Sequence, residues 1–257
     1  MSNPTAAILI IGNEILSGRT QDVNVQFIAQ RLARLGIRLE EVRVVPDVPA
    51  RIIGAVNELR AAYEVLFTTG GIGPTHDDIT SECVAAAFGV ALELHQETAD
   101  AMRAAWGERV NAARLRMATM PKGARPIKNR ASVAPGFSIG NVHVMAGVPR
   151  IMQSMFETLE PGLPRGAAIE MRAVHGVGVF EGSIAAGLTE IQNRFPQIDL
   201  GSYPYKRGEQ WGVALVAKGT DVGALELAVA EAAALIAAHG VVPVAGEPAA
   251  GGEQGDG

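Results

Sequence analysis

The sequence predicts an α/β protein with a mostly parallel sheet, followed by a smaller α+β domain. Short apolar runs alternate with segments of helical periodicity in the first third of the chain, and glycines often stand where these elements end. A segment rich in proline and glycine, 161–164, precedes a second set of elements in the order strand, helix, strand, strand, helix. Alternating strands and helices are typical of βαβ units, in which right-handed crossovers join parallel strands.

The first two elements carry the clearest signals. Residues 6–11 (AAILII) are apolar throughout and end at Gly12, which is typical of a parallel strand buried on both faces. Residues 22–35 have apolar side chains at helical spacing, Asp22 can cap the first turn, and Gly36 can end the helix. These elements form the first half of a βαβ unit.

The remaining elements of the first domain follow the same logic. In chain order we expect a strand (39–45), a helix (50–63), a strand (65–68), a helix (80–88), a mostly helical stretch (96–120), short strands (135–145) and a closing helix (150–159).

Two prolines and a glycine at 161–164 cannot continue a helix, so we place the domain boundary there. The domains are then 1–163 and 164–242, with a tail at 243–257 that is rich in Gly, Ala, Pro and Glu and is expected to be disordered. The small domain is expected to contain a strand (168–174), a helix (182–195), two strands (199–205 and 211–217) and a helix (222–238).

Composition excludes several classes of function. The net charge of −5 gives no field that attracts nucleic acid or an anionic membrane surface. The single cysteine, Cys83, excludes an internal disulfide framework and a cysteine-rich metal site. The sequence has neither an export signal nor an apolar run of membrane-spanning length. We therefore expect a cytoplasmic protein without nucleic-acid or membrane partners.

The segment 68–80, TTGGIGPTHDDIT, is the strongest candidate for a ligand site. It follows a buried strand and precedes a helix, which is where open α/β sheets bind ligands. Gly70, Gly71 and Gly73 permit positive φ angles and close approach of the backbone to an anion. The alternative is a simple strand-to-helix turn in which Asp78 or Thr80 caps the helix. The loop matches neither the dinucleotide nor the P-loop pattern, so it does not identify the ligand.

Asp77 and Asp78 pose an electrostatic problem beside an anion. At 4 Å a carboxylate repels a unit anion by about 4 kcal/mol at an effective dielectric of 20, more than the roughly 0.3–1 kcal/mol gained at a helix terminus. A divalent cation bound by Asp77 or Asp78 reverses the sign of this interaction. The alternative is that these side chains cap backbone groups or contact ribose hydroxyls. His76 is either a ligand or acid/base group, or a loop histidine bonded to backbone.

A second cluster follows the first strand. Gly12, Asn13, Glu14 and Asn24 are expected at the same carboxyl edge of the sheet as the glycine-rich loop, and Asp47 follows the second strand at that edge. These groups either line one crevice together or serve as ordinary caps.

Five motifs, in order over about 150 residues, resemble the MoaB/Mog-type molybdopterin-binding domain, and most closely the N-terminal part of the competence/damage-inducible protein A (CinA) family. They are GNEILSG at 12–18, TTGGIGPTHDDIT at 68–80, the segment from Asn111 through Arg116 to PKGA at 121–124, APGF at 134–137 and AGVPRIMQSMFE at 146–157. The resemblance implies a three-layer molybdopterin-binding fold. Residues 166–240 resemble the next domain of that family, and we expect the deamidase activity of its longer members to be absent.

The resemblance also implies roles for individual residues. Asp47 and Asp78 fall on the two acidic positions of the pterin-phosphate site, and the three loop glycines fall on the phosphate-binding turn. Asn13 stands where the family has an acidic residue, and Asp77 stands where the Mog pattern has arginine. Because Asp77 replaces a cationic side chain with an anionic one, binding of the terminal phosphate of molybdopterin is less favoured. The THDD string is more similar to the corresponding module of FAD synthases.

These arguments favour a metal-dependent pyrophosphatase acting on a nucleotide diphosphate such as ADP-ribose or FAD, using Mg²⁺, Mn²⁺ or Co²⁺. Asp78 and Asp47 would be catalytic. The ligand would be bound by residues of the motifs and their flanks, namely Thr69, Gly70, Gly71, Gly73, Thr80, Gly12, Asn13, Glu14, Asn24, Lys122, Asn129 and Arg150. The alternatives are a molybdopterin-binding protein of cofactor biosynthesis and a non-catalytic nucleotide-binding module. We also expect a homo-oligomer, most simply a dimer.

Overall fold

The computed structural model describes residues 3–248 and divides into two compact units after Gly166. Each unit has a hydrophobic core of its own. No helix in the described part of the chain has the length and apolar character needed to cross a membrane.

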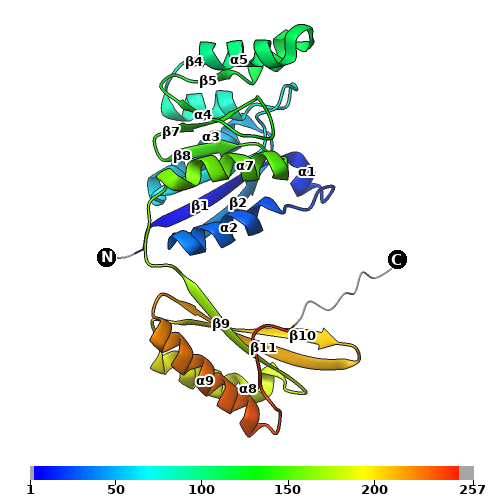
Figure 1. The fold of residues 1–257 in the computed structure, drawn as a ribbon, viewed down its shortest axis with the longest axis vertical. Coiled ribbons are helices and arrows are strands. Elements are labelled where there is room, and N and C mark those ends of the chain that lie inside the picture. The colour runs from blue at the N-terminus through cyan, green and yellow to red at the C-terminus, as the bar shows by residue number, and fades with distance from the viewer. Residues whose placement is uncertain (1–2, 249–257) are drawn as a thin grey trace. The chain divides into compact units, whose positions relative to one another are not determined.

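The first unit is built on a six-stranded sheet (Figure 1). Its strands, in spatial order, are β2 (Arg38–Val45), β1 (Thr5–Ile11), β3 (Val65–Thr69), β8 (Val142–Met145), β7 (Gly136–Ile139) and β6 (Arg125–Ile127). The first four strands are parallel to their neighbours, and β7 and β6 add an antiparallel edge. The predicted α/β class with a mostly parallel sheet is confirmed.

Helices cover both faces of this sheet and make three layers. On one face lie α2 (Asn24–Leu35) and α7 (Pro149–Leu159), and on the other lie α3 (Pro49–Ala62) and α4 (Thr80–Phe88) (Figure 1). Alternate residues of β1 enter the two cores, because Ile8 packs with the first pair of helices and Leu9 with the second. The all-apolar run of β1 is thus explained by burial on both faces.

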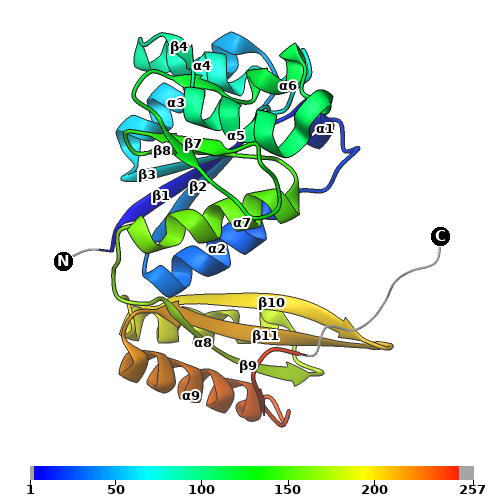
Figure 2. The same cartoon turned by 45° about the horizontal axis from the view of Figure 1, so that its top comes forward.

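A helical lobe lies beside α4 (Figure 2). It consists of β4 (Leu92–Leu94), α5 (Gln96–Trp106), a short 3₁₀ turn (Gly107–Arg109), α6 (Ala112–Arg116) and β5 (Thr119–Pro121). The stretch expected to be mostly helical is therefore interrupted at Gly107, whose φ is 54°, and its end forms the strand β5 that pairs with β4. Asn111 begins α6 by accepting a hydrogen bond from the backbone N–H of Arg114 at 2.9 Å.

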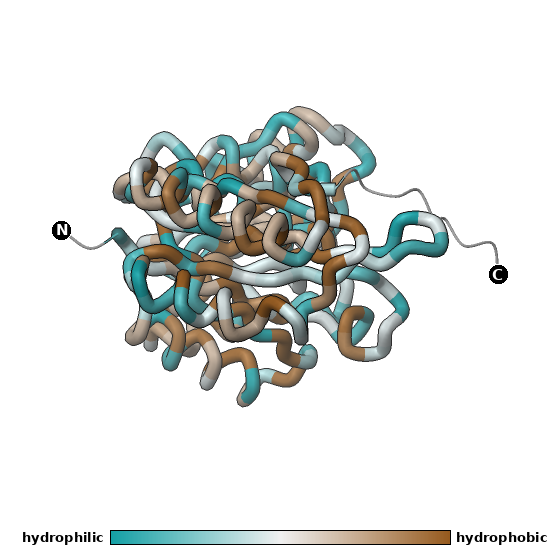
Figure 3. Tube along the Cα trace, turned by 90° about the horizontal axis from the view of Figure 1, so that it is seen from below, coloured by the Kyte–Doolittle hydropathy of each residue, from teal (hydrophilic) through white to brown (hydrophobic). Residues whose placement is uncertain are grey.

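The second unit has the predicted βαββα order. It contains β9 (Glu170–Val177), α8 (Glu181–Arg194), β10 (Asp199–Arg207), β11 (Gln210–Gly219) and α9 (Val222–Ala238), and both helices pack on one face of its antiparallel sheet (Figure 1). The hydrophilic turn between β10 and β11 projects from that sheet (Figure 3).

The tail expected to be disordered from residue 243 begins with an ordered strand instead. Val244 and Ala245 form β12, which pairs with His175 and Val174 of β9 because the edge of that strand has free backbone groups. The rest of that expectation falls largely on residues 249–257, which lie outside the described residues.

The strand order positions the candidate site. β1 lies between β2 and β3, so the crossover from β1 to β2 runs in one direction along the sheet and the crossover from β2 to β3 runs in the other. The strand order therefore changes direction at β1. Open α/β sheets bind ligands at such a point, outside the carboxyl ends of the strands. The loops that follow β1, β2 and β3 all open at this edge.

Candidate functional site

A cavity of about 380 Å³ opens at this edge of the sheet. It is lined by Glu14 from the loop after β1, by the glycine-rich loop after β3, and by Gly147 and Val148 before α7. Met117, Ser132, Ala134 and Pro135 close it on the side of the helical lobe. Segments that are distant in the sequence thus meet at the position predicted for the ligand.

Three glycines of the loop, Gly70, Gly71 and Gly73, bring backbone to the wall of this cavity. Gly70 and Gly71 have φ angles of 101° and 66°, in the left-handed region as predicted, whereas Gly73 is not among the glycines with positive φ. A Cβ atom on Gly70 would collide with the carbonyl oxygen of Ile11, and one on Gly71 would collide with the hydroxyl of Thr80. Only glycine fits at these two positions.

Thr80 fastens the turn to α4. Its buried hydroxyl donates a hydrogen bond to the carbonyl oxygen of Gly70 at 3.0 Å, and its N–H donates to the carbonyl oxygen of Gly71 at the same distance. The N-cap of α4 is Ile79, without a side-chain hydrogen bond, so neither Thr80 nor Asp78 caps this helix. Thr80 therefore holds the glycine turn in place through hydrogen bonds to the backbone of Gly70 and Gly71.

Asp78 lines the cavity and also closes its own loop. Its Oδ2 accepts hydrogen bonds from the N–H of Thr75 at 2.9 Å and from the hydroxyl of Thr75 at 2.5 Å. A Cβ atom on Gly73 would lie 2.6 Å from the same carboxylate oxygen. The loop is therefore folded around one carboxylate that faces the ligand space.

Asp77 and His76 lie on the outside of the loop. The Asp77 side chain is 63% exposed and that of His76 is 98% exposed, and neither lines the cavity. Hydrogen bonding to Thr75 holds the pKa of the Asp77 carboxyl below its usual value. Of the two neighbouring aspartates, only Asp78 is placed to meet a ligand in this cavity.

Arg116, which ends α6, braces the loop from the helical lobe. Its guanidinium donates to the carbonyl oxygens of Thr75 at 3.1 Å and Asp78 at 3.3 Å, and it pairs with Glu82 of α4 at 3.3 Å. The residue appears in the motif that resembles the CinA family, but its spacing from the loop gives no signal of this contact. Arg116 and the loop are about forty positions apart in the sequence, and the fold brings them into contact.

Asn24 joins two sides of the crevice. Its Nδ2 donates to the carbonyl oxygen of Gly147 at 2.8 Å, while its Oδ1 is buried and has no partner among the described residues. Asn24, Glu14 and Thr69 line a small cavity of about 70 Å³ that shares Glu14, Gly70 and Gly147 with the larger one. An N–H donor of a ligand or a water molecule would satisfy the free oxygen.

Asp47 anchors the start of α1 (Asn13–Leu16), a short helix that the sequence did not predict. The Asp47 carboxylate accepts a hydrogen bond from the N–H of Asn13 at 2.8 Å, and it lines neither cavity. A Cβ atom on Gly12 would lie 2.5 Å from the Glu14 carboxylate, so glycine at that position leaves room for Glu14.

The three remaining candidates do not line either of these cavities. Lys122 pairs with Glu93 on the helical lobe at 3.2 Å. The Asn129 side chain accepts from the N–H groups of Ala131 and Ser132 and donates to the carbonyl oxygen of Ala134 at 2.9 Å, so it holds its own turn. Arg150 is exposed at the start of α7.

The donor set suits a hard divalent cation. Glu14 and Asp78 supply carboxylate oxygens from two sides of one cavity, which is the ligand type that Mg²⁺ and Mn²⁺ prefer. Within residues 3–248 no group of three or more His, Cys, Asp or Glu side chains is close enough to hold a metal alone. A cation bound here would be held by two carboxylates together with phosphate oxygens and water, as Mg²⁺ usually is.

Comparison with known families decides the assignment. Residues 7–165 match the family model described as "Probable molybdopterin binding domain", which is more than half of the chain. The chain belongs to the molybdopterin-binding domain family. The second unit of this molybdopterin-binding domain protein matches, over residues 175–245, the model described as "FAD synthase, middle domain". The family resemblance predicted from the five motifs is confirmed.

Proteins from several organisms are similar to this molybdopterin-binding domain protein. A protein from Aeropyrum pernix is 36% identical over 226 residues, with 83% of each chain covered. A CinA-like protein from Desulfovibrio desulfuricans is 34% identical over 233 residues, which cover 86% of this chain and 53% of that protein, so the chain spans about half of that relative. The solved structure of CinA from Thermoplasma acidophilum is 30% identical and superimposes with a TM-score of 0.59, covering 63% of this chain and 99% of that one.

Proposed function

We propose that this protein is a metal-dependent pyrophosphatase that cleaves a nucleotide diphosphate such as ADP-ribose or FAD. The observation that carries the proposal is one cavity in which three glycines of one turn lie beside the carboxylates of Glu14 and Asp78. Phosphate groups approach backbone at such turns, and carboxylates beside them require a cation to offset the repulsion.

Gly70, Gly71 and Gly73 would hold the diphosphate, because all three line the cavity and have no side chain of their own. Glu14 and Asp78 would hold the cation, which neutralises phosphate charge during the displacement. Attack of water on one phosphorus breaks the P–O–P bridge and yields two monophosphates. Asp78 would also orient that water, and Arg116 would keep Asp78 in place through the loop carbonyls.

Binding of a pterin phosphate, as in molybdenum cofactor biosynthesis, is the second candidate. The family model supports it, and so does the partnerless buried Oδ1 of Asn24, because a pterin ring carries N–H donors that could satisfy this acceptor. Asp77 stands on the loop where the Mog pattern has a cation, which counts against tight binding of a terminal phosphate. We therefore rank hydrolysis first.

A substrate screen tests the proposal. Purified protein is incubated with ADP-ribose, FAD or NAD and with Mg²⁺, Mn²⁺, Co²⁺ or EDTA, and monophosphate products are measured. We expect hydrolysis of at least one substrate that EDTA abolishes. Absence of turnover with every metal, together with a thermal shift caused by a pterin or nucleotide, would contradict the pyrophosphatase and favour a binding module.

A further inference from the structure

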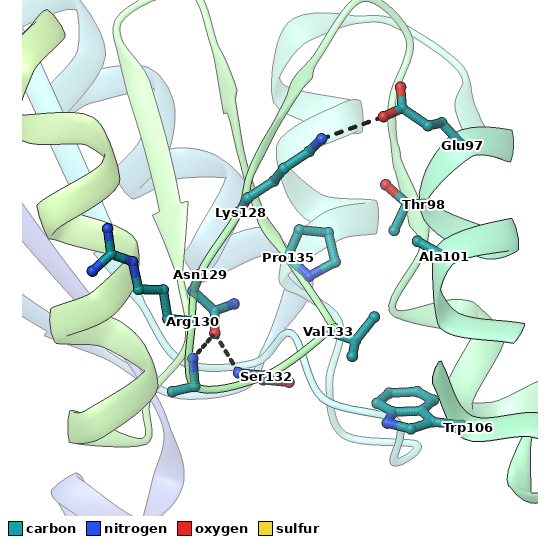
Figure 4. Close-up of a pocket in the computed structure, with 11 residues that line it drawn as sticks. Glu97, Thr98, Ala101, Trp106, Lys128, Asn129, Arg130, Ser132, Val133 and Pro135 are labelled. Atoms are coloured by element: carbon teal, nitrogen blue, oxygen red, sulfur yellow. Dashed lines mark hydrogen bonds and ion pairs between the residues drawn. The ribbon is translucent and has the colours of Figure 1, made fainter. Parts of the chain in front are cut away.

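A second and larger cavity, of about 630 Å³, lies between α5 and the segment 128–135 (Figure 4). Its volume is within the roughly 300–1,000 Å³ typical of small-molecule sites. Of the candidate site residues predicted from the sequence, Asn129 lies in a wall of this cavity. The cavity was not itself predicted from the sequence.

One side of this cavity is apolar and aromatic. Trp106, at the end of α5, lies near Val133 from the facing segment, and Pro135 and Ala101 add further apolar surface (Figure 4). Trp106 and Val133 both pack against the small core of the helical lobe around Met102. The guanidinium of Arg114 also lies over the indole ring, 5.3 Å from its centroid. These contacts hold the indole in position while it still lines the cavity.

The rest of the lining is polar. Lys128 reaches across to Glu97 of α5 at 3.3 Å, and both side chains are about three-quarters exposed (Figure 4). The Arg130 side chain extends away from α5, on the other side of the segment 128–135 (Figure 4), while Thr98 and Ser132 contribute hydroxyl groups to the lining. Lys128 and Glu97 balance each other's charge, so this wall offers hydrogen-bonding groups without a net charge.

This cavity adjoins the one at the glycine turn. Ser132 and Pro135 line both of them, so the same segment forms a wall of each. The Asn129 side chain fixes that segment through its three hydrogen bonds to the backbone. A ligand with its phosphates at the glycine turn can extend past Ser132 into the second cavity.

We propose that the cavity at Trp106 is the nucleobase subsite, in which the aromatic base of the nucleotide stacks on the indole of Trp106. Stacking on an aromatic side chain accepts any base, because every base has a π-face. The inference rests on the proposed function for the choice of a nucleotide as ligand. Beyond that function, it assigns the place where the base lies and the residue, Trp106, that contacts the base.

Fluorescence gives a test that needs neither metal nor turnover. The chain has two tryptophans, and Trp211 lies on β11 in the second unit, so Trp211→Phe leaves Trp106 as the sole emitter. AMP is titrated into this variant and ribose 5-phosphate is the matched ligand without a base. Trp106→Phe, which keeps Trp211, is the matched control protein.

We expect AMP to quench the Trp211→Phe protein saturably, ribose 5-phosphate to leave its emission unchanged, and the Trp106→Phe protein to give no response to AMP. No saturable quench by AMP in the folded Trp211→Phe protein would overturn the subsite, even if the protein hydrolyses ADP-ribose. Quenching by a pterin but not by AMP would also overturn it. A quench by AMP without any hydrolysis would uphold the subsite while the pyrophosphatase proposal fails.

The subsite also predicts a kinetic effect. Trp106→Ala should raise KM for the best substrate of the screen by about tenfold, on the scale of losing one base–aromatic stack, with kcat nearly unchanged. The KM of Trp106→Phe should stay close to the wild-type value, because phenylalanine keeps an aromatic ring on which the base can stack. An unchanged KM in folded Trp106→Ala would contradict the assignment.

Discussion

The side-chain amide of Asn24 donates a hydrogen bond to the carbonyl oxygen of Gly147, although the two residues are 123 positions apart in the chain. This bond ties the start of α2 to the turn before α7, on the side of the crevice opposite the helical lobe. Asn24 is only 4% exposed, so its side chain lies in a buried position.

Replacing this amide by a carboxylate should be costly. Asn24→Asp places a buried charge opposite a carbonyl oxygen and removes the donor, so we expect the free energy of unfolding to fall by about 3 kcal/mol. Asn57→Asp is the matched control, since Asn57 only accepts a hydrogen bond, from Arg60 at 3.0 Å, and aspartate can accept it equally well. Urea unfolding of both variants measures the difference, and equal stabilities would contradict the structural role of Asn24.

The glycine turn predicts a second contrast. Gly70→Ala should unfold the protein or destabilise it by more than about 3 kcal/mol, because the new methyl group meets the backbone of β1 as well as an unfavourable φ. Gly18 has a similar φ of 71° and open space around it, so Gly18→Ala should cost only the strain of about 1–2 kcal/mol. Thermal unfolding compares them, and the expectation fails if Gly70→Ala is the milder change.

Arg116 should affect activity more than stability. Arg116→Ala removes the two bonds that hold the loop carbonyls, so we expect kcat/KM to fall about tenfold or more as Asp78 loses its position. Arg103→Ala removes an arginine on the same lobe that pairs only with Asp100, and it should leave activity unchanged. Equal activities of the two variants would show that the brace is dispensable.

His143 predicts how stability depends on pH. Burial lowers the pKa of His143 to about 4, with Arg125 as a smaller cause, while the unfolded chain has the ordinary value of about 6.5. Between these values only the unfolded state takes up the proton, so stability should fall by about 3 kcal/mol as the pH falls from about 6.5 to about 4. His143→Asn should flatten this part of the profile and the exposed His76→Asn should not, as pH-dependent urea unfolding will measure. Parallel profiles for wild type and His143→Asn would contradict the assignment.

Much of the fold was predictable because local signals agree with the tertiary structure. The apolar run of β1 and the helical spacing in α2 are each explained by burial in the observed cores, and Gly36 ends α2 with a φ of 70°. The helical lobe was less predictable, since β5 forms only by pairing with β4, and β12 only by pairing with β9. Three-residue and two-residue strands carry too little periodicity to be read from sequence.

The site was predictable as a loop but not as a set of contacts. Gly70, Gly71 and Asp78 stand out by their position after a buried strand, and the family motifs point to the same loop. Nothing in the spacing separates Asp78, which faces the cavity, from Asp77, which faces outward, because the turn geometry decides this. Likewise, Trp106 and Arg116 reach their positions only through the packing of the lobe.

The most direct test of the account is metal-dependent hydrolysis by Asp78→Asn and Asp77→Asn, measured on the best substrate of the screen together with thermal unfolding. Asparagine at position 78 can still accept both hydrogen bonds from Thr75, so the loop should keep its shape and the protein its stability. We expect turnover to fall by roughly 100-fold or more in Asp78→Asn and to stay at the wild-type level in Asp77→Asn. Wild-type turnover in a folded Asp78→Asn protein, or an equal loss in both variants, would contradict the account.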